Sequence, residues 1–438
     1  MVEIVEIEER TSAPGRLLGG RLDRPKAGAT SPIHGFELSG WALGDASPVT
    51  AIEISHEGRA VLEVGLDEPR ADIAAAFPQA AGAEHCGFRV PLGSLDLRAD
   101  FELTVTAWCE DGSSAPLATV RGHRRMLPTS GAGLIQPLMV NTIGRSGSTW
   151  LVWLLSRHPE MVAFKPYARD VRVATYWANV AQGLSRPQSY LGQLVPGPLE
   201  DKLWWLDQGG LQAGIAGDPE LEEWLGGNAV EEVFAMCQSR IEAFYSRVAG
   251  SDASPRYFVE KFLPYQVVPD LLKEIYPGAR EVILVRDFRD MLCSVIAFNE
   301  KRGYQAFGRG TARSDAEYVE TTVRYSARRL LKRLRECGDS AHLVRYEDLI
   351  QTPEATLGGM FDYLGLDSGE DAISETLELA ETEVPDYAHH RTTAEVSATI
   401  GRWRDELSPE LAELCSELLD PMLVELGYEP TLEGASQS

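Results

Sequence analysis

From Val140 to Leu151 the sequence reads VNTIGRSGSTWL, and this stretch decides the fold that we expect. A short apolar strand, Leu138–Val140, runs into a turn rich in glycine and serine. The residues that follow the turn have the pattern of a buried helix. Gly144 and Gly147 allow the backbone to curl so that successive N–H groups point inward. The first turn of the helix adds unpaired N–H donors and the positive end of its dipole. The stretch therefore predicts an anion-binding loop between a strand and a helix.

Side chains in the same loop favour an anion as well. Arg145 supplies a full positive charge, and Ser148 and Thr149 supply hydroxyl donors. The loop is not a kinase-type P-loop, because its two glycines are only three residues apart and no lysine follows them. A simpler interpretation stays open, in which Ser146 or Ser148 only caps a helix that follows a strand.

The sequence after this loop alternates between apolar strands and amphipathic helices. Strands are expected at Glu281–Val285 and Ala341–Val344, and helices at Ser148–Arg157 and Asp290–Phe298. This alternation is typical of an α/β domain with a mostly parallel sheet flanked by helices. The loop at 143–147 would then be the P-loop-like, phosphate-binding turn of that domain.

The sequence before the loop predicts a smaller antiparallel β-sandwich domain, because short alternating runs are separated by Gly, Asp and Pro turns. The runs lie at 36–43, 51–55, 59–64, 87–91 and 101–108, with one short helix at 72–77. Pro128–Gly133 reads as a linker. We therefore expect an accessory domain at 1–130, linker included, and a second domain at 131–438.

A helical segment at about 171–255 is rich in tryptophan and forms an insertion in the second domain. Its tryptophans are Trp177, Trp204, Trp205 and Trp224. They are suited to stacking on sugar rings or aromatic acceptors, or to packing in a core.

Composition excludes several classes of function. The formal net charge is −25 and the pI is about 4.8, so a nucleic-acid partner is not expected. The six cysteines form no CxxC pair and no zinc-like cluster, which fits a reducing compartment and predicts no metal site. The N-terminus does not resemble a signal peptide, and no apolar run approaches the roughly 20 residues of a membrane span. We expect a soluble, cytoplasmic protein; the oligomeric state stays open.

A second segment, VRDFRDMLCS from Val285 to Ser294, also combines a strand end with a helix start. Arg286 stands at the carboxyl end of the strand, where open α/β sheets bind ligands. Its planar guanidinium suits phosphate. The alternative is a helix start in which Asp287 or Asp290 pairs with Arg289.

These two segments resemble the nucleotide-binding motifs of PAPS-dependent sulfotransferases of the bacterial type, where PAPS is 3′-phosphoadenosine-5′-phosphosulfate. Residues 142–150, TIGRSGSTW, resemble the family's 5′-phosphosulfate loop. The resemblance implies that Arg145 contacts the sulfate and that Trp150 lies against the adenine. It also implies that the remaining loop residues bind the nucleotide: Ser146, Gly147, Ser148 and Thr149.

Residues 286–294 match the family pattern Arg-x-x-(Lys/Arg)-Asp-x-x-x-Ser, which implies that Arg286 and Ser294 bind the 3′-phosphate. Tyr346, in a Tyr-Glu-Asp segment, resembles the residue that approaches the adenine. Gly401 and Arg402 resemble the start of the loop that closes over the nucleotide, although cytosolic members have Gly-Asp-Trp-Lys there and this chain has Gly-Arg-Trp-Arg.

The resemblance also implies a transfer mechanism without a metal, in which cations stabilise charge on the leaving phosphate. Lys261 resembles an active-site lysine that precedes a proline, and Arg145 is the second cation. Both usual positions of the general base are occupied by other residues, Phe262 and Lys165. The remaining candidates are Asp170, Glu260 and His390, of which His390 can titrate near neutral pH.

The resemblance covers about 134–428 and predicts transfer of a sulfuryl group from PAPS to a hydroxyl or, less readily, an amine. A carbohydrate or small metabolite is the expected acceptor. Two alternatives stay open: a nucleotide-dependent small-molecule kinase, and a binding protein that keeps the nucleotide fold without catalysis. A kinase would need a Mg²⁺ site and a lysine in the loop, and neither pattern is visible.

Overall fold

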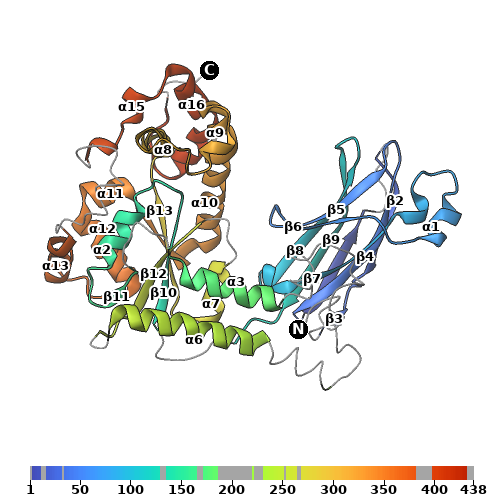
Figure 1. Cartoon of the computed structure of the whole chain (residues 1–438), viewed down its shortest axis with the longest axis horizontal. Coiled ribbons are helices and arrows are strands. Elements are labelled where there is room, and N and C mark those ends of the chain that lie inside the picture. Colours follow the sequence, from blue (N-terminus) through green and yellow to red (C-terminus); the bar gives the residue numbers. More distant parts are fainter. Residues whose placement is uncertain are drawn as a thin grey trace. The chain divides into compact units, whose positions relative to one another are not determined.

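The computed structural model divides the chain into two compact units, one formed by residues 1–129 and 176–239 and the other by 130–175 and 240–438. It describes residues 2–10, 16–31, 34–128, 135–164, 171–185, 220, 230–250, 253–263, 268–380 and 397–431. Figure 1 labels the elements along the chain.

The first unit contains two antiparallel sheets. One has the strand order β3-β1-β9-β8-β5-β6, and the other has the order β2-β4-β7. The strands are β1 Val2–Glu9, β2 Leu17–Arg24, β3 Thr30–Ser31, β4 Gly35–Gly44, β5 Val49–His56, β6 Arg59–Gly65, β7 Gly87–Gly93, β8 Asp100–Cys109 and β9 Ser114–Arg124. The helix α1 spans Ala71–Ala76, and short 3₁₀ turns lie at Ala83–His85 and Ser94–Asp96.

The two sheets share one apolar core, which is built from buried side chains of both sheets. Leu38 and Phe88 come from the smaller sheet, and Ile54, Leu103 and Val120 come from the larger one. The antiparallel arrangement expected from the alternating runs is confirmed. The strand runs predicted from the sequence did not include β1, although the alternation of Val2–Glu9 is itself a strand pattern.

The second unit contains a five-stranded parallel sheet with the order β11-β12-β10-β13-β14. Its strands are β10 Gln136–Thr142, β11 Met161–Val162, β12 Tyr257–Phe262, β13 Arg280–Val285 and β14 Ala341–Arg345. From β10 the chain first builds one side of the sheet and then crosses to the other. Ligands in open α/β sheets bind where the strand order reverses in this way, at the carboxyl ends of the strands.

The helices of this part of the chain follow the expected alternation. They are α2 Ser148–Leu155, α3 Val173–Ser185, α6 Val230–Ala249, α7 Val268–Ile275, α8 Phe288–Arg302, α9 Asp315–Tyr318, α10 Arg324–Cys337, α11 Tyr346–Gln351, α12 Pro353–Leu364, α13 Glu370–Ala380, α15 Trp403–Glu406 and α16 Pro409–Glu425. A π-helical turn, Val319–Val323, joins α9 to α10, and 3₁₀ turns lie at Arg309–Thr311, Gly338–Ser340 and Ser397–Thr399. The unit boundaries fall within α3 and α6. Trp204, Trp205 and Trp224 lie outside the described residues.

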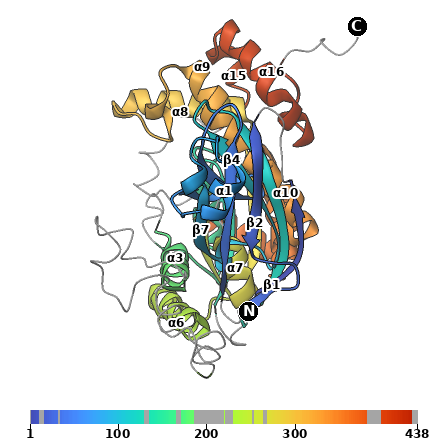
Figure 2. The ribbon, with the colours of Figure 1, turned by 90° about the vertical axis from the view of Figure 1, so that its right-hand side faces the viewer.

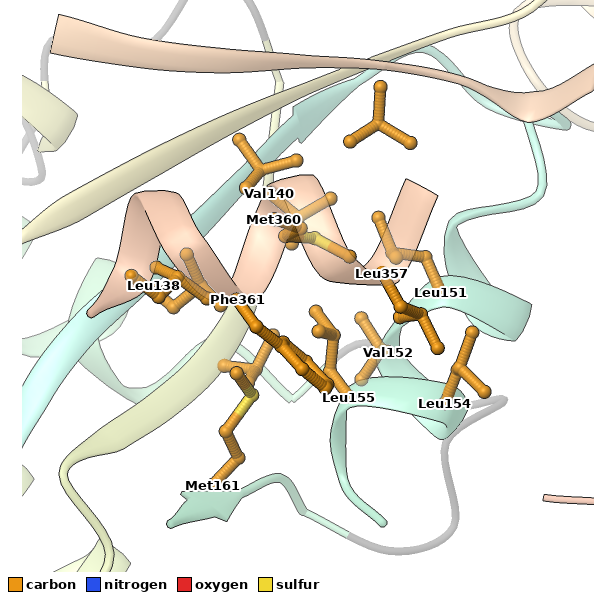
Figure 3. Close-up of a cluster of buried hydrophobic side chains, with 14 of the residues drawn as sticks. Leu138, Val140, Leu151, Val152, Leu154, Leu155, Met161, Leu357, Met360 and Phe361 are labelled. Atoms are coloured by element: carbon orange, nitrogen blue, oxygen red, sulfur yellow. The ribbon is translucent and has the colours of Figure 1, made fainter. Parts of the chain in front are cut away.

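Both faces of the parallel sheet are buried, as parallel sheets require. On one face, Leu138 and Val140 of β10 pack with α2, α12 and their neighbours, as Figure 3 shows. On the other face, Ile283 and Val285 of β13 pack with α8, α10 and α16. Val282 and Leu284 of β13 belong to the first of these cores, so alternate residues of one strand serve both. The prediction of a mostly parallel sheet flanked by helices is confirmed.

Helices α8, α9, α15 and α16 lie together at one end of the second unit in both Figure 1 and Figure 2. Helix α8 begins directly after β13, so this group of helices gathers at the carboxyl end of that strand. The same end of the sheet carries the loop between β10 and α2.

Candidate functional site

The loop between β10 and α2 curls tightly through two residues with positive φ. Arg145 has φ 70° and Gly147 has φ 87°. The Ser146 hydroxyl donates to the Ile143 carbonyl at 2.7 Å, and the Thr142 hydroxyl donates to the Leu284 carbonyl of β13 at 2.9 Å. Since an L-residue rarely adopts a positive φ, these bonds hold a conformation that the chain would not otherwise prefer.

Aromatic rings lie directly against both glycines of the loop. A Cβ at Gly144 would approach a ring carbon of Phe307 to 2.5 Å, and a Cβ at Gly147 would collide with the ring of Tyr346. A side chain at either position would force the neighbouring ring to move. Tyr346, predicted to approach a nucleotide base, thus lies against the loop.

Arg145 is partly buried beside other cations. Its Nε donates to the hydroxyl of Ser294 at 3.1 Å, and its guanidinium lies 4.7 Å from the ring centroid of Phe298. Burial, with the neighbouring charges of Arg286 and Arg402, lowers the pKa of Arg145 to about 10. The side chain is still charged at neutral pH, and an anion at this place would relieve the repulsion between the cations.

Arg286 stands at the carboxyl end of β13 and is 5% exposed. Its Nη1 donates to the Arg145 carbonyl at 3.0 Å and its Nη2 to the Thr399 carbonyl at 2.7 Å. The guanidinium lies 4.6 Å from the Tyr346 ring centroid. Its Nε is buried and has no hydrogen-bond partner within the described part of the chain. A buried cation with an unused donor is costly unless an anion binds it.

Arg289, three residues further on, is fully paired. Asp287 caps α8 by accepting from the Arg289 backbone N–H at 2.9 Å, and its carboxylate also accepts from the Arg289 guanidinium. The guanidinium reaches Glu429 and Thr431 near the end of the described chain, and lies 3.9 Å from the Trp403 ring centroid. The alternative predicted from the sequence, a capped helix start with a paired arginine, is therefore correct for Arg289. It does not account for Arg286, which is not part of this ion pair.

Asp290 holds the segment that carries Thr399. Its carboxylate accepts from the backbone N–H groups of Gly401 at 2.7 Å and Trp403 at 3.0 Å. Burial raises the pKa of Asp290 to about 6, although the two N–H groups oppose the shift. The sequence indicates Asp290 only as a possible partner of Arg289, a place that Asp287 takes. Asp290 thus fixes the turn whose Thr399 carbonyl accepts from Arg286. In the same turn, the Thr399 hydroxyl is hydrogen-bonded to the Tyr346 hydroxyl at 3.0 Å.

The guanidinium of Arg402 forms an ion pair with Glu406, four residues later, at 2.8 Å. Gly401 is bound through its backbone to Asp290. Trp403 is 6% exposed and packs in the interior. Trp150 is partly buried against the core that includes α2.

Glu260 and Lys261 face opposite sides of β12. Lys261 Nζ donates to the Thr149 hydroxyl at 3.0 Å. Glu260 is 2% exposed and accepts from the Ala174 backbone N–H at 2.8 Å and from the Tyr245 hydroxyl. Burial raises the pKa of Glu260 to about 7. Its carboxylate therefore caps α3, while Lys261 is the residue directed toward the loop.

A cavity of about 370 Å³ adjoins this loop on the side of Lys261. It is lined by Thr142, Ile143, Gly144, Ser148, Arg172, Lys261, Phe262, Leu263, Met291, Phe307, Gly308, Tyr318, Thr322, Val323 and Ser326. The lining is largely apolar, with hydroxyls and two cations, and includes no Asp, Glu or His among the described residues. Sequence reasoning did not predict Phe307, Tyr318 or the π-helical turn, because no local pattern brings them to the loop.

Two predicted candidates for the general base, His390 and Asp170, lie outside the described residues. No cluster of three or more His, Cys, Asp or Glu side chains suited to a metal ion occurs in the ranges that the structure describes. Within those same ranges, no helix has the length and apolar character to cross a membrane.

The sequence profile described as the sulfotransferase family matches residues 137–371, more than half of the chain. No curated protein matches the chain. Among solved structures, the sulfotransferase domain from the curacin biosynthetic pathway is similar at 17% identity, with 68% of this chain and 100% of that one covered and a TM-score of 0.42.

Two further structures are similar. Mouse sulfotransferase SULT7A1, complexed with PAP, is 11% identical, with 68% of this chain and 88% of that chain covered and a TM-score of 0.37. A sulfotransferase from Alicyclobacillus acidocaldarius is 15% identical, with 66% and 94% covered and a TM-score of 0.35. On the profile match, which spans both predicted anion-binding segments, this chain belongs to the sulfotransferase family.

Proposed function

We propose that this chain transfers a sulfuryl group from PAPS to a hydroxyl acceptor, releasing 3′,5′-adenosine bisphosphate (PAP). The observation that carries the proposal is Arg286, a buried guanidinium with an unused Nε, two bonds to backbone carbonyls and no ion pair with a described carboxylate. A terminal phosphate supplies what this group lacks, namely negative charge and acceptor oxygens in a planar array.

In this proposal the two arginines bind different parts of the donor. Arg286 and Ser294 hold the 3′-phosphate, and Tyr346 offers its ring to the adenine. The loop residues Ser146 to Thr149 bind the 5′-phosphosulfate. Arg145 connects the residues proposed for the two phosphate groups, because it belongs to the loop and its Nε bonds to the Ser294 hydroxyl. Trp150, Gly401 and Arg402 complete the proposed nucleotide site.

Transfer would proceed by in-line displacement. The acceptor oxygen bonds to sulfur as the bond from sulfur to the bridging oxygen breaks, and the electron pair goes to the leaving phosphate. Lys261 and Arg145 stabilise the charge that develops there. The acceptor would enter the cavity beside Lys261. We keep His390 and Asp170 as candidates to accept its proton. Glu260 is the weaker candidate, because its carboxylate is buried against α3.

We also propose that residues 1–130 form an accessory domain and that 131–438 carry the transferase, with a small molecule or a carbohydrate as the acceptor. Glu231, at the start of helix α6, belongs to the first unit, where it accepts from His34 at 3.3 Å and also pairs with Arg125. A truncation that begins at residue 131 would remove both of these partners of Glu231. It should still bind PAP, with lower solubility than the full chain.

The test is calorimetric titration of the full chain with PAP in EDTA, with AMP and ATP as controls. Micromolar binding that requires the 3′-phosphate supports the proposed donor. Binding of ATP only when Mg²⁺ is supplied would instead indicate a kinase. Binding of PAP without turnover of PAPS over a panel of acceptors would indicate a nucleotide-binding protein without catalysis.

A further inference from the structure

Phe307 combines three features that seldom occur together. It is a non-glycine residue with φ 57°, its side chain is 40% exposed, and its ring lies against a glycine of the phosphate loop. A positive φ is disfavoured for any residue with a Cβ, and 40% of this residue's surface remains in solvent. The backbone conformation therefore does not explain why a phenylalanine occupies this position, and its ring is only partly used for packing.

Several bonds hold the segment around Phe307 in place. Gly303 caps the end of helix α8 in a left-handed conformation, and the buried side chain of Asn299 accepts from the Ala306 backbone N–H at 2.9 Å. The Tyr318 hydroxyl donates to the Phe307 carbonyl at 2.7 Å. Gly308 follows, also with positive φ. The surrounding structure thus fixes a strained backbone, which is a frequent feature of functional sites.

The ring of Phe307 is directed toward the chemistry of the proposed site. It meets Phe298 edge-on, with 5.4 Å between ring centroids, and lies 5.9 Å from the guanidinium carbon of Arg145. It covers Gly144, and it lines the same cavity as Lys261. An apolar surface therefore stands where the phosphate loop borders the cavity.

We propose that Phe307 is a specificity-determining residue that shields the transferring sulfuryl group from water and shapes the acceptor entrance. The inference rests on the proposed function, because it assumes that PAPS occupies the loop. The reaction that it suppresses is hydrolysis. A water oxygen bonds to sulfur, the bond from sulfur to the bridging oxygen breaks, and hydrogen sulfate and PAP leave while the second water proton passes to solvent. Exclusion of water is a recognised way to prevent such side reactions.

The test compares Phe307→Ala with Tyr304→Ala in the full chain. Tyr304 is a matched control, because it lies in the same segment, is 55% exposed and also packs edge-on against Phe298, at 6.4 Å. It does not line the cavity. Sulfate released from radiolabelled PAPS without acceptor measures hydrolysis, and PAP titration measures whether the nucleotide site is intact.

We expect Phe307→Ala to raise acceptor-free hydrolysis about tenfold while the Kd for PAP stays within about threefold of the parent. Phe307→Leu should give an intermediate rate, since it keeps part of the apolar cover. Tyr304→Ala should behave as the parent. Thermal unfolding of each variant verifies that it is folded.

Three results would overturn the inference: hydrolysis unchanged in Phe307→Ala, an equal increase in Tyr304→Ala, or loss of PAP binding in Phe307→Ala. The last would make the ring a support of the loop instead of a shield. Failure of the proposed function is separate from these, because it would show as absent PAP binding in the parent protein.

Discussion

The two ends of strand β13 contain buried ionic groups of opposite kinds. At the amino end, Glu281 is fully buried and its carboxylate accepts from Arg333 at 2.7 and 2.8 Å and pairs with Lys273. At the carboxyl end, Arg286 is bonded to carbonyl oxygens, and among the described residues its Nε has no hydrogen-bond partner. The charge of Glu281 is thus balanced by basic side chains, whereas no described carboxylate forms an ion pair with Arg286.

The pKa directions of the carboxyl groups show the same difference. Burial opposes ionisation of Glu281, but Arg333 and Lys273 outweigh it and lower the pKa of that carboxyl. Burial raises the pKa of Asp290, and the nearby Arg286 does not reverse the shift. The comparison teaches that a buried arginine marks a binding site only where no carboxylate of the protein already satisfies it.

The largest expected effect is on stability and comes from the amino end. Arg333→Met leaves the buried Glu281 without its main partner, and removal of one member of such a pair costs about 3–5 kcal/mol of unfolding free energy. Urea unfolding measures the loss. The double variant Arg333→Met with Glu281→Leu should recover much of it, because no charge is then left uncompensated. An unchanged midpoint in the single variant would contradict the role assigned to this pair.

At the carboxyl end the expected effect is on binding. Arg286→Met removes two charge-assisted bonds to phosphate, each about 1.5 kcal/mol, so the Kd for PAP should rise on the order of 100-fold. Its unfolding midpoint should fall much less than that of Arg333→Met, because removal of a buried cation without a described carboxylate partner offsets part of the loss of its two bonds to carbonyl oxygens. Calorimetry and urea unfolding measure the two quantities. A loss of stability like that of Arg333→Met, with PAP affinity unchanged, would erase the difference between the two ends.

Arg145, at the same end, should affect the rate more than the affinity. PAP lacks the sulfuryl group, so Arg145→Ala should weaken its binding less than about tenfold while slowing PAPS turnover about 100-fold. Arg145→Lys, which keeps the charge, should recover part of the rate. Single-turnover kinetics with PAPS measures the effect. Equal turnover in parent and Arg145→Ala would remove this residue from the mechanism.

Local patterns in the sequence were sufficient to predict much of this end of the sheet. The turn at 143–147, the position of Arg286 after a strand, and the parallel sheet all follow from short-range periodicity and glycine placement. Strand alternation predicts that Glu260 and Lys261 lie on opposite faces of their strand. Which of the two faces the loop follows only from the bonds of Glu260 to α3 and of Lys261 to Thr149.

Other features depend on residues that are far apart in the sequence. Asp290 binds Gly401, 111 positions later, and Phe307 meets Gly144, with no local pattern in either case. The pairing of Arg289 with the end of the chain is of the same kind. Such contacts arise when helices pack around the strand ends. They join residues far apart in the sequence, so no short stretch of sequence predicts them.

The smallest expected effect is on the pH dependence of stability. The pKa of Asp290 is raised from its ordinary 3.8 to about 6, so between these values the folded protein keeps a proton that the unfolded chain has lost. For this group, unfolding free energy therefore rises as the pH falls through that window. Glu281 has the opposite sign: its pKa is lowered, and its contribution is lost as the pH falls below its folded pKa.

Asp290→Asn should remove the contribution of Asp290 to the pH dependence of stability and leave that of Glu281 in place. The difference in unfolding free energy between parent and variant should then change by on the order of 1 kcal/mol between pH 6.5 and pH 4.5. The contributions of other buried carboxyl groups, such as Glu260, are the same in both proteins and cancel in this difference. Parallel curves for the two proteins would mean that ionised Asp290 is not disfavoured and that Arg286 already has a carboxylate partner. In that case the carboxyl end of β13 would be as complete as the amino end, and the anion site would lose its main support.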